Sequence, residues 1–375
     1  MRPFARSDTS IIARWWWSVD KVMLWAIVAV IAIGILLNFS ASPVAAPRMG
    51  FVDNYALLKK QLMWLPISFI LMIVMAFQAP KTVRRIALLV LFGAFVMTVA
   101  TLFVGESTKG SQRWISLFGF SCQPSEFLKP SFAIISAWLL AMGRKTSNNR
   151  YTLVSMGLLV SIMMVLLMQP DMGMTFTMVV IWASQFFLAG ISLFVVLIIA
   201  LAIVVFGIAS YFFVPHFQFR INNFLKPESG DTYQVDKAER AFSSGGLFGT
   251  GPGEGIVKSD IPDAHTDFIM AVAGEEFGFL LCMLIIVLFA LIIFRGFAMA
   301  MKENDLFSLI AVAGLLIQFG WQAVINMSST LHLIPTKGMT LPFISYGGSS
   351  LVSIGFAMGM VLALTRKRTG GEITE

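Results

Sequence analysis

The stretch DIPDAHTDFIMAVAGEEFGFLL, residues 260–281, begins like a soluble loop and ends like a membrane helix. Asp267 lies near the point where the character changes, and Glu275 and Glu276 lie further inside the apolar part. Carboxylates at membrane depth are costly, so those that are present have a structural or a chemical purpose. The stretch therefore predicts a membrane protein with a polar site close to one surface.

The composition of the whole chain agrees with this interpretation. Of the 375 residues, 57% are hydrophobic and 13% are charged, whereas a soluble domain has roughly 25% charged residues. Apolar runs of about 20 residues recur along the chain, and each is long enough to cross a bilayer as a helix. The runs are continuous rather than alternating, which excludes a transmembrane β-barrel. We therefore predict an all-α polytopic membrane protein in which residues 1–375 form a single transmembrane domain.

Hydropathy predicts about ten spans, with one long connection, 214–265, between the seventh and the eighth. The first apolar run is too long for the core of a signal peptide, so we interpret it as the first span. The stretch 172–213 is almost unbroken, and we divide it at Gly190. The predicted spans are 20–40, 61–79, 86–104, 124–142, 152–169, 172–189, 191–213, 266–294, 306–330 and 345–365.

The distribution of basic residues predicts the orientation. The N-terminal tail 1–19, the C-terminal tail 366–375 and the connections on the same side carry 15 Lys and Arg residues, against six in the short connections on the other side. Basic residues are enriched in cytoplasmic connections. Both termini are therefore predicted to be cytoplasmic, and the net charge of +7 needs no nucleic-acid partner to explain it.

Several charged residues then lie at the outer ends of spans. Glu126 and Lys129 are three residues apart, so they share a helix face and can pair, in a structural or in a functional role. Arg113 precedes their span. Asp171 lies in the tight turn QPDMG, where a turn or helix-capping role is at least as favoured as function.

The segment PTKGMTLPFISYGGSS, residues 335–350, is broken by proline and glycine where it enters the last span. Irregular backbone at membrane depth is stable only inside protein or along a cavity. We therefore expect Lys337, Ser345 and Tyr346 to line a cavity.

The glycine-rich centre of the long loop, 245–255, lacks the βαβ context of a nucleotide site. It is interpreted as a flexible loop, or as backbone that approaches a ligand closely.

Helical geometry separates the carboxylates of the opening stretch. If residues 263–280 are helical, Glu275 lies about 12 Å along the helix from Asp267, and Glu276 points to the opposite side. Asp267 is therefore the one carboxylate at the outer mouth, while Glu275 and Glu276 are expected to tie helices together. His265 is expected to orient Asp267. No histidine or cysteine spacing indicates a metal site.

At this point the motifs become recognisable as a set. QRWI, QPSEFLK, SSGGLFGTG, PDAHTDFIMAVAGEEFG and KGMTLPFISYGGSS resemble, in order and spacing, those of the SEDS family (shape, elongation, division and sporulation) over nearly the whole chain. The segment from Lys337 to Ser350 is more similar to the division branch of the family than to the elongation branch.

The resemblance implies a ten-span fold and peptidoglycan glycosyltransferase activity on lipid II in the bacterial cytoplasmic membrane, enriched at the division septum. It implies as partners the nascent glycan strand, a class B penicillin-binding protein that acts as a transpeptidase, and other membrane proteins of the divisome. The essential aspartate of the family corresponds to Asp267, and the charged pair corresponds to Glu126 and Lys129.

Residues and resemblance together suggest a mechanism. Asp267 would be the general base that takes the proton of an acceptor hydroxyl, because aspartate is ordinarily ionised at neutral pH. Undecaprenyl pyrophosphate would leave with inversion, and Arg113, Lys129 and Lys337 are the candidate cations for it. The sequence leaves a divalent cation such as Mg²⁺ or Mn²⁺ open as a cofactor. The alternatives are a lipid II flippase, an elongation polymerase and a non-catalytic scaffold.

Overall fold

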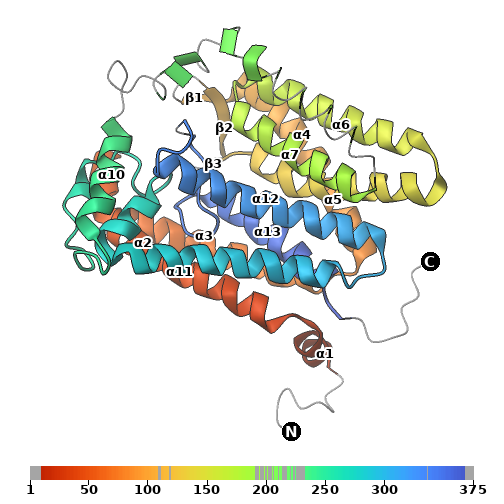
Figure 1. Ribbon diagram of the computed structural model, residues 1–375, viewed down its shortest axis with the longest axis horizontal. Helices are drawn as coiled ribbons and strands as arrows, with labels where there is room; N and C mark the ends of the chain where they lie inside the picture. The colour runs from red at the N-terminus through yellow and green to blue at the C-terminus, as the bar shows by residue number, and fades with distance from the viewer. Residues whose placement is uncertain are drawn as a thin grey trace.

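The computed structural model describes residues 10–108, 111–117, 120–190, 233–335 and 337–367, with scattered positions between 194 and 224. These residues are mostly helical, and the long helices lie alongside one another (Figure 1). Among the described residues, the end of the helix Ile11–Ser18 and Lys367, close after the last long helix, lie side by side. The predicted span 191–213 lies largely outside the described residues, as do the first part of the predicted loop 214–265 and the outermost parts of both tails.

Nine of the predicted spans coincide with described helices, and six of these helices are long and apolar enough to cross a membrane. The ends differ from the prediction by several residues, because polar residues extend some helices beyond the apolar run. The nine helices are α2 (Lys21–Arg48), α3 (Ala56–Ala76), α4 (Pro80–Val104), α5 (Ser125–Thr146), α6 (Asn149–Met168), α7 (Met172–Leu188), α11 (Ile269–Ala300), α12 (Leu306–Thr330) and α13 (Gly348–Leu364).

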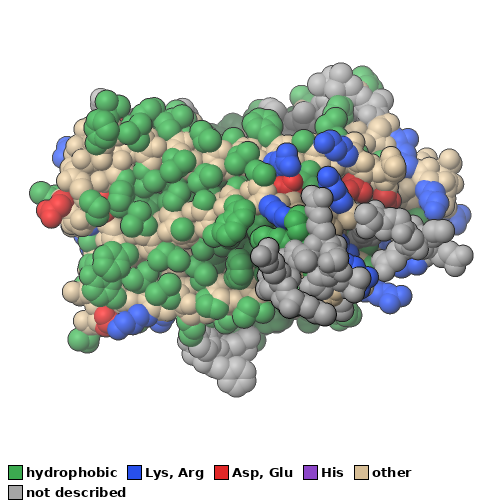
Figure 2. All heavy atoms as spheres, turned by 90° about the horizontal axis from the view of Figure 1, so that it is seen from below, with side chains coloured by type: hydrophobic (Ala, Val, Ile, Leu, Met, Phe, Trp, Pro, Cys, Tyr) green, Lys and Arg blue, Asp and Glu red, His purple; other side chains and the backbone are tan. Residues whose placement is uncertain are grey.

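The centre of the bundle is α12, which packs against α5, α7, α11 and α13. Most of its membrane-length stretch is buried, whereas α3, α4 and α6 leave most of their apolar side chains exposed. On the face seen in Figure 2, hydrophobic side chains cover the middle, and Lys, Arg, Asp and Glu gather toward both ends. An apolar belt between charged ends is the surface expected of a chain that spans a bilayer.

The prediction of an all-α chain is wrong between the fourth and fifth long helices. Three short strands, β1 (Glu106–Thr108), β2 (Ser111–Leu117) and β3 (Phe120–Cys122), form an antiparallel sheet in the order β1-β2-β3. Hydropathy detects apolar runs of 18 residues or more, so strands this short gave no signal. The sheet matters for the site because β2 carries Arg113.

Shorter helices are found in the N-terminal tail and in the long loop that precedes α11. The N-terminal tail contains α1 (Ile11–Ser18), whose last residue accepts a hydrogen bond from Lys367 N at 3.1 Å, beyond the end of α13. The predicted loop 214–265 contains α10 (Tyr233–Gly245) and the short 3-10 helix η2 (Val257–Asp260). The buried side of α10 packs against α11, so this part of the loop is structured.

The glycine-rich segment after α10 inserts into a break in α11. Gly278 has φ 73° and ψ −171°, which interrupts the helix. In a regular helix the N–H groups of residues 279 and 280 would donate to the C=O groups of 275 and 276. Here Phe279 N and Leu280 N donate to the carbonyls of residues 246 and 247, and Thr250 N and Gly251 N donate to the carbonyls of 275 and 276. The loop therefore satisfies the backbone groups that the break releases.

This exchange explains the glycines without a nucleotide or a ligand. A side chain at Gly249 would collide with the carbonyl of Glu276, and Gly249 also has φ +84°. Gly253 has the same φ of +84° but open space around it. Glycine is therefore required at 249 both for its dihedral angle and for close backbone approach, and at 253 for the dihedral angle alone.

Gly249→Ala should therefore destabilise the protein more than Gly253→Ala. Both pay about 1–2 kcal/mol for the left-handed conformation, and Gly249→Ala adds about 1–3 kcal/mol for overpacking. Thermal unfolding in detergent measures the difference. Equal melting temperatures for the two variants would contradict the insertion of the loop into α11.

Candidate active site

Asp267 lies in the turn 262–268, just before α11 begins at Ile269. The assumption of a helix over 263–280 is therefore wrong for the residues before 269. Two side chains of α12 hold this turn by its backbone. The carbonyl of Asp267 accepts hydrogen bonds from Asn326 Nδ2 at 2.9 Å and from Thr330 Oγ1 at 3.2 Å. Asp267 as a residue is half-buried, and its backbone is fixed by these two hydrogen bonds.

The irregular segment between α12 and α13 lies against this turn. Asn326 Nδ2 also donates to Met339 O at 2.7 Å, so a single amide group joins the two segments. Lys337 N donates to Ser329 Oγ at 3.0 Å. A Cβ atom on Gly338 would lie 3.1 Å from Oδ2 of Asp267, so only glycine fits here without moving that carboxylate.

Lys337, Arg113 and Asp171 form one charged cluster, although the sequence placed them in separate motifs. Lys337 Nζ lies 3.0 Å from Asp171 Oδ1, and Arg113 Nη1 lies 3.1 Å from Asp171 Oδ2. Arg113 also donates to the carbonyls of Gln169 at 3.3 Å and Pro170 at 2.9 Å. The sheet and the turn before α7 are thereby joined to the segment that faces Asp267.

The cluster keeps Asp171 ionised. Burial acts to raise the pKa of this carboxyl, but the charges of Lys337 and Arg113 and its hydrogen bonds outweigh burial, so its pKa lies below the ordinary value of 3.8. One of those hydrogen bonds comes from Met174 N at 3.1 Å, so Asp171 also caps α7. Asp171 is thus both a helix cap and a counter-ion to two cations.

Glu126 and Lys129 form a second network. Their ion pair of 2.8 Å confirms that the i,i+3 spacing brings them together. Lys129 is fully buried, and its Nζ donates to Gln322 Oε1 at 3.0 Å. Gln322 Nε2 in turn donates to the carbonyl of Thr340 at 3.0 Å. This network therefore also ends on the segment that follows Gly338.

Ser345, His265 and Tyr346, which were also predicted at the mouth, link the turn of Asp267 to the segment before α13. Ser345 Oγ donates to the carbonyl of Thr266 at 2.6 Å and accepts from Leu341 N at 2.8 Å, so it joins the two segments from inside. The rings of His265 and Tyr346 lie 5.6 Å apart, and Tyr346 N donates to His265 O at 2.9 Å. Contacts of these residues with a substrate stay predictions.

Glu275 and Glu276 lie apart from this cluster, on the part of α11 that receives the glycine-rich loop. Glu275 accepts from Val257 N and Lys258 N, both at 2.7 Å. Glu276 pairs with Lys258, whose Nζ also donates to Ser40 Oγ at 3.1 Å. Both carboxylates thus hold the loop against α11 and α2.

Sequence reasoning missed the polar side of α12. Gln322, Asn326 and Thr330 are spaced by four residues within an otherwise apolar span, and this spacing places them on one helix face. A search for polar residues at a spacing of four inside apolar spans would have found them. Among the described residues, no group of three or more His, Cys, Asp or Glu is placed to hold a metal ion.

With this geometry established, comparison with known proteins is informative. A family model described as "Cell cycle protein", covering FtsW, RodA and SpoVE, matches residues 21–370. The chain belongs to this family. The match confirms the resemblance inferred from the motifs.

Curated relatives of this FtsW/RodA/SpoVE family match the chain over nearly its whole length. A probable peptidoglycan glycosyltransferase FtsW of Caulobacter vibrioides is 40% identical, covering 98% of this chain and 94% of the relative. The FtsW proteins of Trichlorobacter lovleyi and Escherichia coli O6:H1 are 36% and 33% identical, each covering 92% of this chain.

Solved structures of the family share the fold. A chain from a peptidoglycan synthase complex, described for its coordination of polymerization and crosslinking, has a TM-score of 0.77, is 24% identical and covers 92% of this chain and 97% of that one. The rod shape determining protein RodA of Thermus thermophilus has a TM-score of 0.69, is 23% identical and covers 93% of this chain. The helical arrangement is therefore that of the FtsW/RodA/SpoVE family.

Asp171→Asn should destabilise the protein at neutral pH by about 2 kcal/mol, less than for a fully buried pair because Lys337 and Arg113 are partly exposed. Since the folded pKa of Asp171 is lowered, its contribution is present above the ordinary value of 3.8 and is lost as the pH falls through the folded value. The gap in melting temperature between wild type and variant should therefore shrink below about pH 4.

Asp53→Asn is the matched control, because the ion pair of Asp53 with Lys59 is exposed. It should leave the melting temperature unchanged at neutral pH. An Asp171→Asn variant as stable as the control would show that the cluster of Lys337, Arg113 and Asp171 does not hold the irregular segment between α12 and α13 in place.

Proposed function

We propose that this chain is a peptidoglycan glycosyltransferase that polymerises lipid II into glycan strands at the outer face of the bacterial cytoplasmic membrane. The observation that carries the proposal is the placement of Asp267, with its backbone fixed by α12 and its carboxylate against Gly338. The relatives named as probable peptidoglycan glycosyltransferases support the reaction class.

The reaction needs a base, because the acceptor is a sugar hydroxyl. The Asp267 carboxylate takes the proton of that hydroxyl while the oxygen attacks the anomeric carbon of the donor. The bond from that carbon to undecaprenyl pyrophosphate breaks, the leaving group takes the electron pair, and the anomeric centre inverts. A positioned carboxylate suits this role because general-base catalysis depends first on geometry.

Lys337 and Arg113 are the cations proposed to meet the leaving pyrophosphate. Both are partly exposed and lie around one carboxylate, that of Asp171. Lys337 is also the neighbour of Gly338, so its backbone is fixed beside Asp267. Lys129 differs, because it is fully buried and bound to Glu126 and Gln322. We assign Lys129 a supporting role: through Gln322 it holds Thr340 in the segment after Gly338, without contacting the substrate itself.

The cellular setting follows from charge and from the relatives. The excess of Lys and Arg at the end that carries both termini favours a cytoplasmic position for that end, and Asp267 then faces outward. The FtsW names of the relatives favour division at the septum over elongation. A class B penicillin-binding protein is the proposed partner, supported by the neighbour that belongs to a peptidoglycan synthase complex.

Asp267→Asn should abolish polymerisation of purified lipid II, with a loss of about 10²–10⁴-fold, while the melting temperature stays near that of wild type. The readout is the length of glycan product with purified protein and fluorescent lipid II. Asp263→Asn is the matched control, because Asp263 lies in the same turn, and it should keep activity. Wild-type product from Asp267→Asn would reject the base, and absence of product from wild type with its partner would favour a flippase or a scaffold.

Gly338→Ala tests positioning rather than charge. The new Cβ would lie 3.1 Å from Oδ2 of Asp267, so the carboxylate must move by a few tenths of an ångström. We expect about a tenfold fall in kcat, because misplacement by 1 Å costs about 100-fold. Gly347→Ala is the control, since its Cβ would meet the methyl group of Thr340 at 3.3 Å and Cβ of Ser350 at 3.7 Å, and no carboxylate. Equal kcat for the two variants would contradict the proposed contact.

A further inference from the structure

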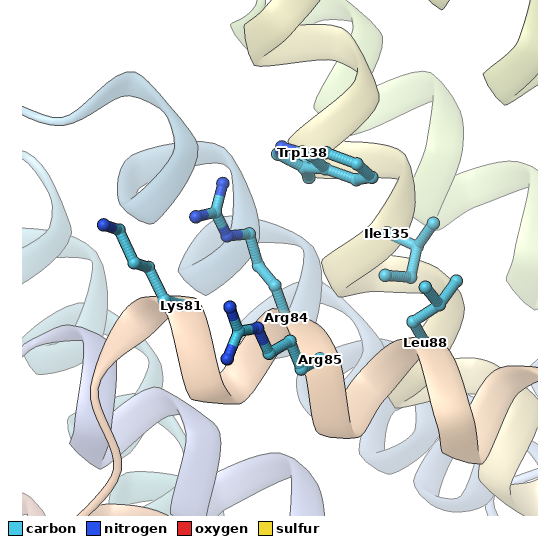
Figure 3. Close-up of a pocket in the computed structure, with 6 residues that line it drawn as sticks. All are labelled: Lys81, Arg84, Arg85, Leu88, Ile135 and Trp138. Atoms are coloured by element: carbon cyan, nitrogen blue, oxygen red, sulfur yellow. The ribbon is translucent and has the colours of Figure 1, made fainter. Parts of the chain in front are cut away.

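A cavity of about 340 Å³ opens between the first turns of α4 and the second half of α5, far along the chain from Asp267 (Figure 3). Three basic side chains of α4 project into it from the same side, and apolar side chains from α4 and α5 form the rest of its wall (Figure 3). The lining residues are Lys81, Arg84, Arg85, Leu88, Ile135 and Trp138.

The described residues around this cavity supply no counter-charge for its three basic side chains. Within the described part of the chain, no carboxylate lies within ion-pair distance of Lys81, Arg84 or Arg85. Asp305 at the start of α12 is engaged in capping its own helix. The first turn of α4 has no acidic residue and its N-cap Ala79 has no capping side chain, so the helix dipole adds positive charge. An anion is the ligand that this arrangement favours.

Arg84 is held in place by aromatic rings rather than by a carboxylate. Its guanidinium carbon lies 5.7 Å from the ring centroid of Trp138 and 5.3 Å from that of Phe307. Contacts of this kind leave the planar N–H groups of an arginine available for a phosphate. The cavity is therefore preorganised for a ligand with phosphate oxygens.

The surroundings indicate the source of that phosphate. Beyond the cavity, α4 exposes large apolar side chains, with Leu88 49% exposed, Leu89 73% and Phe92 71%. Basic residues therefore give way to a lipid-facing surface within about two turns of one helix. Leu88 and Ile135 form an apolar side of the cavity wall (Figure 3), and Leu88 is also part of the exposed apolar surface of α4. A free phosphate would leave this apolar wall without a partner, whereas a lipid would cover it.

We propose that this cavity binds the headgroup of an anionic phospholipid, with Lys81, Arg84 and Arg85 around its phosphate and Leu88 and Ile135 against its acyl chains. Basic pockets between transmembrane helices are suited to such headgroups. Arg84 lies against Phe307 in the first turn of α12, whereas Thr330, the last residue of α12, holds the turn of Asp267, so the cavity lies at the opposite end of α12 from that turn. With the proposed orientation, the lipid belongs to the cytoplasmic leaflet.

The test counts lipid that stays bound. The full-length protein is purified from nanodiscs of phosphatidylcholine with phosphatidylglycerol, transferred to a mild detergent, and examined by native mass spectrometry. Wild type should retain phosphatidylglycerol in preference to phosphatidylcholine. Arg84→Gln combined with Arg85→Gln should bind it about 30-fold more weakly. Trp138→Leu, which removes no charge, should weaken retention several-fold.

Arg14→Gln combined with Arg150→Gln is the matched control, since both are exposed arginines outside the cavity. This control should retain lipid like wild type. Equal loss in the control and in the cavity variant would overturn the proposal in favour of a general surface charge effect, as would the absence of retained lipid in wild type. If millimolar inorganic phosphate displaced the lipid, the proposal that Leu88 and Ile135 bind its acyl chains would be overturned. Melting temperatures in neutral detergent verify that each variant is folded.

Discussion

The structure depends on one constraint: every backbone N–H and C=O group of an irregular segment packed among apolar helices must find a partner within the protein. Two segments of this chain face that constraint. The glycine-rich loop exchanges hydrogen bonds with the break at Gly278 of α11. The segment from Lys337 to Tyr346 is held by polar side chains of α12 and by the turn before α11. Asp267 lies in that turn, so the contacts of the second segment bear directly on its position.

The charges follow from the same constraint. The buried ammonium of Lys129 is balanced by its ion pair with Glu126 and by the hydrogen bond that it donates to Gln322, and the same Gln322 donates to the carbonyl of Thr340. Asp171 pairs with both Lys337 and Arg113 and thereby joins the sheet to the irregular segment. Each network supports the segment from a different helix. The segment that faces the carboxylate of Asp267 is therefore held by buried and partly buried charges on several elements, which is the arrangement expected of a preorganised site.

Much of the helical fold could be predicted because it rests on local signals. Continuous apolar runs located nine helices, and the spacing of Glu126 and Lys129 indicated their ion pair. The loop insertion could not be predicted, because it pairs residues 246 and 247 with 279 and 280 through backbone atoms that carry no sequence signal. The pairing of Asp171 with Lys337 joins residues 166 positions apart. Such contacts depend on how the helices pack rather than on any local pattern.

The proposed chemistry requires the Asp267 carboxylate to face the acceptor hydroxyl. A cryo-electron microscopy structure of this protein, with the proposed transpeptidase partner and a lipid II analogue that cannot react, measures the distance between them directly. We predict a separation of about 2.6–3.2 Å between a carboxylate oxygen of Asp267 and the acceptor oxygen, with Lys337 or Arg113 on the pyrophosphate. An acceptor oxygen bound to a different carboxylate, with Asp267 turned away from the sugar, would contradict the claim.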